Sequence, residues 1–419
     1  MKRAILVGIL CCIHVVSHCQ TINHPFPNHT QYAKGSIKPT HPKQAKLDSV
    51  VIKFYDFWKK SYIKNDCSAS DHYYVYTDEG DTKDNIPTIC VSEGQGFGMV
   101  IVPLMAGYDK DAQTIYDGMY RFVMAHPTAK SQDLMSWSIS KGCITTKHKT
   151  EDEYDNTSAT DGDLDITLSL FIADAQWGSN GAINYKEEGV KRAKAILDHE
   201  INRQKHTVLL SDANDPGDYD FFDIRTSDFM PTHLKVFNKY YPSPEWNLVV
   251  NKTYQIFAAI QSKYSPKVGL LPDFITYKNN KYIPAKPNYL ESPNDGAYYY
   301  NACRIPFRVG LDYLINGDTR AQQLLNPLTG WVQTKTRNSI DKLTTGFYLN
   351  GQAIPKHSYT VPSFVCPMAV GSMLNSENQE WLNDSGDYID QLEVKDYKYY
   401  DNTIQMLSLI ALSGNFWLP

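Results

Sequence analysis

Amphipathic helical segments recur along this 419-residue chain and constrain its fold more than any other feature. The apolar spacing of one helix face, at i, i+3 or i+4 and i+7, is found in residues 50–58, 190–201, 256–260 and 311–315. The chain has no strong strand-like alternation, no short sequence repeat and no clear break in composition. We therefore predict a single all-α domain over residues 47–419.

Long loops rich in Gly, Pro, Asn, Asp and Tyr separate the helical segments, at residues 140–162, 208–230 and 262–298. Loops of this length in a compact domain usually carry function. Helices that alternate with such loops predict an α-barrel or α-toroid, with a site built from the loops at one end.

The first 20 residues have the features of a secretory signal peptide. Lys2 and Arg3 precede an apolar run over residues 4–16, which is too short to span a bilayer well, and we expect no transmembrane helix after it. We expect a secreted or periplasmic protein, and Cys19 leaves a cell-surface lipid anchor as an alternative. Residues 21–46, rich in Pro, His, Thr and Asn, are expected to form an extended arm.

Charge and cysteine content exclude other classes of function. The 41 Lys and Arg residues against 46 Asp and Glu residues leave a net charge of −5, without the basic surface that nucleic-acid binding needs. The cysteines after the leader form neither a CxxC pair nor a Cys/His cluster at zinc spacing, so we expect no metal or other cofactor. Their odd number leaves at least one thiol unpaired, and we expect most of them to be buried free thiols: Cys67, Cys90, Cys143, Cys303 and Cys366.

Three stretches concentrate residues suited to chemistry. The first, Ser-Glu-Gly-Gln-Gly-Phe-Gly-Met at residues 92–99, sets Glu93 among glycines that permit a tight backbone and leave open space beside the carboxylate. A helix starting here directs its N-terminal amide groups and positive dipole end at this loop. The alternative is a glycine-rich turn with an incidental glutamate.

The second stretch, residues 159–166, alternates Asp161, Asp163 and Asp165. Alternating aspartates can bind calcium, but a calcium loop needs Glu at its twelfth position, where this chain has Ile172. The run that follows is apolar and looks like a helix instead. Capping and structural hydrogen bonding are the alternative roles for Asp163 and Asp165.

The third stretch places Glu291 in a loop with Pro and Gly, shortly before three tyrosines ending at Tyr300, and Arg304. Arg304 suits a carboxylate or a sugar hydroxyl, and the alternative is a tyrosine-rich surface loop. Separated carboxyl groups with many aromatic side chains meet the needs of glycoside hydrolysis: one carboxyl donates a proton to the leaving oxygen, and the other activates water or attacks the sugar. The chain has neither a Gly-x-Ser-x-Gly elbow nor a His-Glu-x-x-His motif.

In order along the chain, these stretches resemble glycoside hydrolase family 8, a family of bacterial endoglucanases, lichenases, chitosanases and some xylanases. Residues 92–99 resemble the family's general-acid motif, with the acid at Glu93. Residues 159–177 resemble its signature, although Thr167 stands where the family usually has Ala, and the match gives Asp161 the contact with the sugar at the cleavage point. The resemblance implies an (α/α)6 barrel and hydrolysis with inversion.

One position departs from the common family pattern. Many members have an Asp base in Tyr-Asp-Ala-x-Arg, whereas this chain has Asn301, and an amide cannot act as that base. A subgroup resembling certain chitosanases and lichenases has Asn there and takes its base from a Glu ten residues upstream, which corresponds to Glu291. Asn301 is then expected to bind sugar or position the water, and Asp295 is the alternative base. An inverting pair needs carboxyl groups roughly 6.5–9.5 Å apart.

The resemblance also implies substrate-binding residues. Trp137 matches a position where the family stacks a sugar ring, with a plain core position as its alternative, and Tyr300 and Arg304 match residues beside the base. Phe229 is a further candidate platform.

We expect endo-hydrolysis of a β-1,4-linked polysaccharide by a secreted monomer. We favour β-glucan, with chitosan and then xylan as alternatives. Chitosan is polycationic and suits the acidic run of Glu151, Asp152, Glu153 and Asp155, although such a run is more often a solvated face. A non-catalytic carbohydrate-binding protein is the remaining alternative.

Overall fold

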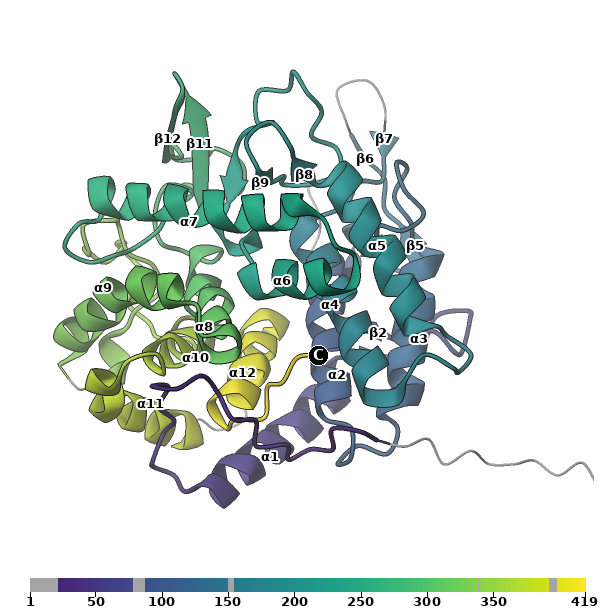
Figure 1. Ribbon diagram of the computed structural model, residues 1–419, viewed down its shortest axis with the longest axis horizontal. Helices are drawn as coiled ribbons and strands as arrows, with labels where there is room; N and C mark the ends of the chain where they lie inside the picture. Colours follow the sequence, from purple (N-terminus) through teal and green to yellow (C-terminus); the bar gives the residue numbers. More distant parts are fainter. Residues whose placement is uncertain (1–21, 78–86, 150–153, 338, 392–397) are drawn as a thin grey trace, which may run out of the picture.

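The computed structural model describes residues 22–77, 87–149, 154–337, 339–391 and 398–419. Within these residues, twelve α-helices are arranged as an inner and an outer ring (Figure 1). The predicted (α/α)6 barrel is therefore confirmed.

The inner ring consists of α2 (Ser92–Leu104), α4 (Thr160–Trp177), α6 (Pro231–Tyr240), α8 (Ile305–Asn316), α10 (Pro362–Ser372) and α12 (Tyr399–Leu412). Each inner helix packs against the next, and α12 closes the ring against α2. Nearly every residue of α2, α4, α10 and α12 is buried, because these helices have neighbours on all sides.

The outer ring consists of α1 (Gln44–Tyr62), α3 (Ala112–Ala125), α5 (Tyr185–His199), α7 (Pro244–Tyr264), α9 (Thr319–Thr336) and α11 (Gln379–Gln391). Each outer helix packs mainly against one inner helix, for example α1 against α12 and α5 against α4, while α5 also contacts α6 and α9 also contacts α10. Outer helices bury one face only, as in α1, where Val51, Phe54 and Trp58 point into the core. The helical segments predicted from apolar spacing fall in α1, α5, α7 and α8, except that Ile201, the last residue of the segment 190–201, lies in a short strand after α5.

Short strands form small antiparallel sheets within the long loops. The pairs are β1 (Ile63–Lys64) with β2 (Tyr74–Val75), β6 (His148–Lys149) with β7 (Tyr154–Asp155), and β8 (Ile201–Asn202) with β9 (Thr207–Val208). The three-stranded sheets are β3 (Thr88–Val91), β4 (Ser138–Ser140) and β5 (Ile144–Thr145), and β10 (Ile224–Arg225), β11 (Phe274–Lys278) and β12 (Lys281–Pro284). Most of these strands are too short to leave an alternating pattern in the sequence.

Residues 22–43, before α1, lie across the end of the barrel where the inner helices terminate (Figure 1). Carbonyl groups in the last turn of a helix lack a partner within that helix. Backbone N–H groups of this arm donate to carbonyl groups at five such ends: Asn23 to Gln176 of α4, Phe26 to Ala106 after α2, Thr30 to Gly414 after α12, Ala33 to Leu314 of α8, and Ile37 to Met373 after α10. The arm thus caps one end of the barrel.

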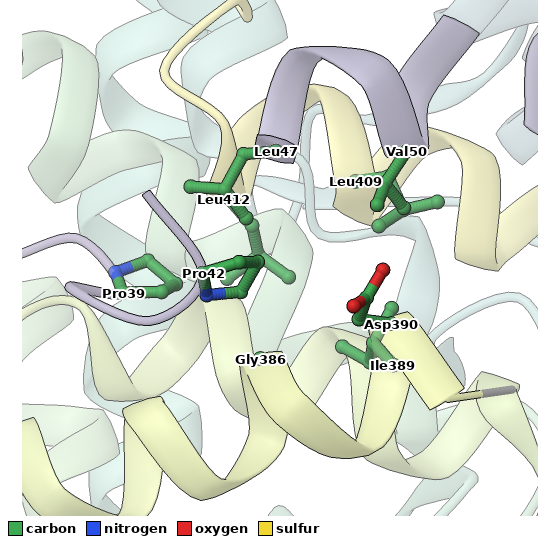
Figure 2. Close-up of a pocket in the computed structure, with 9 residues that line it drawn as sticks. All are labelled: Pro39, Pro42, Leu47, Val50, Gly386, Ile389, Asp390, Leu409 and Leu412. Carbon is green, nitrogen blue, oxygen red and sulfur yellow. The ribbon is translucent and has the colours of Figure 1, made fainter. Parts of the chain in front are cut away.

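A small cavity of about 10 Å³ remains where the arm meets α1, α11 and α12 (Figure 2). This volume holds about one water molecule, so the seam is a packed joint with no room for a sugar. Its lining is mostly apolar: Pro39, Pro42, Leu47, Val50, Gly386, Ile389, Asp390, Leu409 and Leu412.

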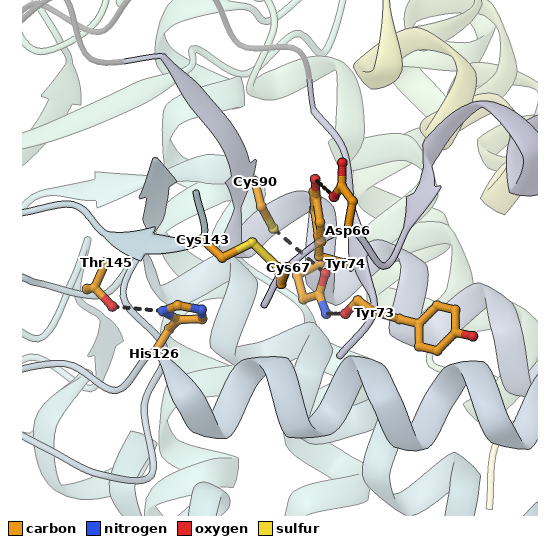
Figure 3. The surroundings of a disulfide bond; sticks show 9 residues. Asp66, Cys67, Tyr73, Tyr74, Cys90, His126, Cys143 and Thr145 are labelled. Atoms are coloured by element: carbon orange, nitrogen blue, oxygen red, sulfur yellow. Dashed lines mark hydrogen bonds between the residues drawn. A yellow bond between two sulfur atoms is a disulfide. The ribbon is translucent and has the colours of Figure 1, made fainter. Parts of the chain in front are cut away.

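Cys67 and Cys143 form a disulfide, with their Cα atoms 5.8 Å apart (Figure 3). The bond ties the segment after β1 to the turn between β4 and β5, and β4 in turn pairs with the strand that leads into α2. Cys90, Cys303 and Cys366 are buried free thiols, as predicted for most of the cysteines.

Two predicted segments lie wholly or partly outside the described residues. They are the leader, residues 1–20, and the acidic run, of which residues 150–153 are not described. Among the described residues, none of the helices has the length and apolar character needed to cross a membrane.

Candidate active site

Glu93 lies in the first turn of α2, directly after β3 ends at Val91. The start of this helix is fixed because the N–H of Ser92 donates to the carbonyl oxygen of Trp137, at 2.9 Å. The Glu93 side chain is largely buried, with 17% exposure. Its Oε1 accepts a hydrogen bond from the Tyr399 hydroxyl at 3.0 Å, and its Oε2 accepts one from Nη1 of Arg304.

The glycines after Glu93 allow close helix packing; they do not leave the open space that we expected. A Cβ at Gly96 would lie 2.9 Å from the carbonyl oxygen of Gly162 in α4, and a Cβ at Gly162 would lie 2.4 Å from Oγ of Ser92. Neither distance is tolerated, so α2 and α4 approach backbone to backbone here. This contact brings the first turns of α2 and α4 together, and with them Glu93 and Asp161.

Asp161 occupies the first turn of α4 and is almost fully buried. Its Oδ1 accepts the N–H of Gly162 at 2.9 Å, and its Oδ2 accepts Nη1 of Arg304 at 2.9 Å. Burial alone would raise the pKa of Asp161, but the charges of Arg304 and Arg225 outweigh it and hold the pKa below its ordinary value. Asp161 is therefore ionised at neutral pH.

Arg304, at the end of the 3₁₀ helix η2 (Ala302–Arg304), connects the candidate residues. Its Nη1 bonds both Glu93 and Asp161, while its Nη2 donates to Oγ of Ser227 at 2.8 Å and to Oδ1 of Asn301 at 2.6 Å. Together, these four contacts fix the orientation of the Arg304 guanidinium group, which is buried at the centre of the site.

Asn301 extends this network to Glu291. Because Oδ1 of Asn301 accepts from Arg304, its Nδ2 is turned toward Glu291 and donates to Oε2 at 2.7 Å. Glu291 lies in the loop between β12 and η2, and its side chain is 43% exposed. A continuous chain of hydrogen bonds thus joins Glu93 and Glu291 through Arg304 and Asn301.

The model of glycosyl hydrolases family 8 matches residues 43–414 of this chain. The chain belongs to glycosyl hydrolase family 8. It is therefore a glycoside hydrolase.

Relatives match this family 8 chain over nearly its whole length. A β-glucanase from Niallia circulans is 39% identical over 400 residues, which cover 94% of this chain and 91% of that protein. An endoglucanase from Bacillus sp. (strain KSM-330) is 36% identical over 398 residues, covering 94% of this chain and 82% of that protein. A solved apo structure of a β-1,3-1,4-glucanase from Paenibacillus sp. X4 superposes with a TM-score of 0.88 and 38% identity, covering 95% of this chain and 100% of that one.

Asp295, which we considered as an alternative base, shapes the loop of this family 8 site. Its side chain is fully buried, and its carboxylate accepts the backbone N–H groups of Leu290, Glu291 and Ser292 at 2.7, 3.1 and 2.8 Å. A carboxylate so occupied, with no access to solvent, is poorly suited to activating a water molecule. The loop that it organises presents Glu291.

The predicted sugar platforms differ in their positions. Trp137 is half-buried. Its backbone joins the segments that precede α2 and α4, because its carbonyl oxygen accepts the N–H of Ser92 and its N–H donates to the carbonyl oxygen of Thr157, each at 2.9 Å. Tyr300 is half-buried and packs edge-to-face on Tyr299, with ring centroids 4.7 Å apart.

Phe229 does not fit the predicted role of a platform. It is 1% exposed and packs edge-to-face against Tyr254 and Phe257 of α7, with ring centroids 5.0 and 5.3 Å away. A ring enclosed in this way cannot stack on a sugar, so Phe229 is a core residue that supports the segment before α6.

Asp163 and Asp165 have structural roles. Residues 160–177 form one continuous helix, which rules out a calcium-binding loop starting at Asp161. Asp165 pairs with Arg308 and with His233, and Asp163 pairs with Arg192. Within the described parts of the chain, no three His, Cys, Asp or Glu side chains are grouped so as to hold a metal ion.

Three residues of the family 8 site are not predicted by the sequence motifs. Tyr399, at the start of α12, donates to Glu93 from the far end of the sequence. Arg225 contacts Glu291 at 3.0 Å and Asp228 at 3.4 Å. Burial raises the pKa of Asp228 to about 7, against the lowering effect of Arg225. The polar segment Arg-Thr-Ser-Asp at residues 225–228, next to Phe229, was the available signal.

Proposed function

We propose that this family 8 enzyme is an inverting endo-hydrolase of β-glucan, with Glu93 as general acid and Glu291 as general base. The observation that carries the proposal is the hydrogen-bonded chain from Glu93 through Arg304 and Asn301 to Glu291. It gives each carboxyl a distinct setting, one buried at a helix start and one on an exposed loop. An acid and a base on opposite sides of the bond to be cleaved are what inversion requires.

We assign Glu93 as the general acid and Asp161 as an ionised contact to the sugar from the charges around them. Both share one guanidinium nitrogen of Arg304, and a second negative charge beside Asp161 is unfavourable. Since Asp161 stays ionised, we assign the proton that is donated to the leaving oxygen to Glu93. We propose that Asp161, ionised and held by Arg304, contacts the sugar at the cleavage point.

The amide at position 301 supports Glu291 as the base, and on this ground we propose that the chain belongs to the subgroup with Asn in place of the usual Asp. An aspartate here could still accept from Arg304 but could not donate to Glu291, and it would set two carboxylates about 2.7 Å apart. The asparagine instead provides a neutral donor that leaves Glu291 as the carboxylate facing solvent. We propose that Tyr300 and Arg304, on either side of Asn301 in the sequence, contribute to substrate binding, and that Trp137 is the stacking platform.

We further propose that the enzyme is secreted as a monomer. The disulfide between Cys67 and Cys143 supports this location, because such bonds persist in oxidising compartments. The leader-like residues 1–20 agree with it.

The substrate proposal follows the relatives, whose names are β-glucanase and endoglucanase at 36–39% identity. The test measures the release of reducing ends from mixed-linkage β-glucan and, in parallel, from highly deacetylated chitosan. We expect cleavage of the glucan, a loss of about 100-fold or more in Glu291→Gln, and normal turnover in Glu377→Gln, an exposed glutamate of the 3₁₀ helix η4 (Ser376–Asn378). Cleavage of chitosan alone contradicts the substrate, and near-normal turnover of Glu291→Gln contradicts the base.

A further inference from the structure

We propose that Arg225 is the positioning residue of Glu291, and that it fixes both the orientation and the charge of this carboxylate. The inference rests on the proposed role of Glu291 as general base. It predicts that Arg225 determines the acid limb of the pH–rate profile, although its guanidinium has no assigned contact with the sugar.

The sheet of β10, β11 and β12 determines where Arg225 lies. Arg225 is the last residue of β10 and pairs in register with Phe274 of β11. Its guanidinium carbon lies 5.4 Å from the centroid of the Phe274 ring, so the side chain stacks on the same neighbour that its backbone pairs with. The Arg225 side chain is 13% exposed, whereas Glu291 is 43% exposed. A well-anchored cation therefore holds a carboxylate on an exposed loop.

Each oxygen of Glu291 has its own donor from a different segment. Nη2 of Arg225 donates to Oε1 at 3.0 Å, and Nδ2 of Asn301 donates to Oε2 at 2.7 Å. Two donors on two segments fix the rotation of the carboxylate more firmly than one donor does. Asn301 is neutral, so the positive charge at this carboxylate comes from Arg225.

The neighbouring charges explain why this cation is needed. The charged groups that face Glu291 or Arg225 from the surrounding elements are Asp161, Asp228, Asp273, Asp295 and Arg304. Four of these are acids, and Arg304 is already bonded to Glu93 and Asp161. Without Arg225, the Glu291 carboxylate would lose the cation that contacts it, and its negative charge would be less stabilised.

Asp228 anchors Arg225 from the opposite side. Its Oδ2 lies 3.4 Å from Nη1 of Arg225, and its Oδ1 accepts from Oγ of Ser227, which also accepts from Arg304. The two terminal nitrogens of the Arg225 guanidinium thus bond to different acids, Nη1 to the buried Asp228 and Nη2 to the exposed Glu291. This division turns Nη2 toward the loop of the base.

The experiment compares the pH dependence of kcat/KM on mixed-linkage β-glucan for wild type, Arg225→Gln, Arg225→Met and Arg225→Lys. We expect the acid limb to move up by about one pH unit in the two neutral variants, with the alkaline limb unchanged. Arg225→Lys retains the charge and should keep the wild-type acid limb while kcat falls. Arg203→Met, at an exposed arginine bonded to Asp198, is the matched control and should leave the profile unchanged.

Thermal unfolding of each variant separates positioning from folding, and Arg225→Gln, which retains a hydrogen-bond donor, supplies the test if Arg225→Met does not fold. An unchanged acid limb in a folded neutral variant overturns the inference. The same shift in Arg225→Lys also overturns it, because the charge is then not responsible. Glu291→Gln is measured alongside: normal turnover there refutes the base itself, whereas an inactive Glu291→Gln with unshifted Arg225 variants refutes only the role of Arg225.

Discussion

At one end of the barrel, the first turns of α2 and α4 present Glu93 and Asp161 to Arg304 at the start of α8, and Tyr399 in the first turn of α12 donates to Glu93. At the opposite end, the last turns of inner helices are covered by residues 22–43, whose backbone N–H groups bond to the helix carbonyl groups. The two ends of the inner helices therefore differ in their contacts. Side chains of the site, several of them charged, pair at the N-terminal end, and backbone hydrogen bonds from the arm cover the C-terminal end.

The difference follows from the polarity of a helix. N-terminal turns have unpaired N–H groups and a partial positive charge, which favour carboxylates such as Asp161. C-terminal turns have unpaired carbonyl groups, which need donors, and an extended arm supplies them from its backbone. We therefore expect substitutions at the first end to change chemistry and substitutions at the second end to change stability.

The largest effect is expected for Glu93→Gln. Loss of the proton donor should reduce turnover of β-glucan by about 10³-fold. The loss should be much smaller on an aryl β-glucoside with a dinitrophenyl leaving group, because that group departs without protonation. Steady-state kinetics on the two substrates provide the comparison, and an equal loss on both contradicts the role of Glu93 as acid.

Asn301→Asp tests whether the base can be moved. In the single variant, two neighbouring carboxylates share a proton, so kcat/KM should fall by about 10-fold or more. In the double variant Glu291→Gln/Asn301→Asp, the new carboxylate takes the position that it has in many family members, and activity should recover above that of Glu291→Gln alone. Initial rates on mixed-linkage β-glucan measure this; a double variant as inactive as Glu291→Gln shows that position 301 does not accommodate a base.

Phe26→Ala tests the arm end of the barrel. Phe26 is 5% exposed, and its N–H bonds to the carbonyl of Ala106 after α2. Removing the ring should cost about 3–5 kcal/mol of stability. We expect a lower Tm by calorimetry and an unchanged kcat well below it. A reduced kcat at an unchanged Tm would mean that the two ends are not separable.

We expect the smallest effect for Glu200→Gln. This substitution should change the stability of the protein and leave its activity unchanged. Glu200 is fully buried behind the first turn of α4, accepts from Oγ of Ser158 at 2.5 Å, and lies near Asp163 and Asp212. Burial, and then the charge of Asp163, raises the pKa of Glu200 well above its ordinary value, and burial raises that of Asp163 to about 7.

The sign of the pH dependence follows from these pKa values. The folded protein keeps its proton on this cluster, whereas unfolded carboxyl groups ionise near pH 4, so wild-type stability should fall as the pH rises from about 4 through 7. Glu200→Gln mimics the protonated form and should flatten this fall, with a Tm about 2 °C above wild type at pH 8. Parallel slopes of Tm against pH for the two proteins would contradict this.

The sequence predicted the outer helices better than the inner ones. In α1 and α5, one buried face alternates with a solvated face, so the period of 3.6 residues is visible. In α10 every residue is buried, and an apolar helix without a polar face carries no such period. The alternation of helices with long loops predicted an α-barrel or α-toroid, and the family resemblance specified the (α/α)6 barrel, which the structure and the comparisons confirm.

Within the site, the sequence identified residues that lie in motifs and missed those that depend on tertiary pairing. Arg225 meets Glu291 across 66 residues because β10 pairs with β11, and a two-residue strand leaves no sequence signal. Phe229 was assigned to the site because aromatic residues suit both cores and sugar platforms. The polar Asp228 beside it is the residue that joins the network.

The most direct test of the central claim, that Glu291 is the base of an inverting pair with Glu93, is azide rescue of Glu291→Ala on a soluble β-glucan oligosaccharide, followed by proton NMR. Azide needs no base, so it should accelerate the variant and give an α-glycosyl azide, while wild type first releases the α-anomer of the sugar. A β-glycosyl azide, a β-anomer as the first wild-type product, or no acceleration by azide would contradict the account.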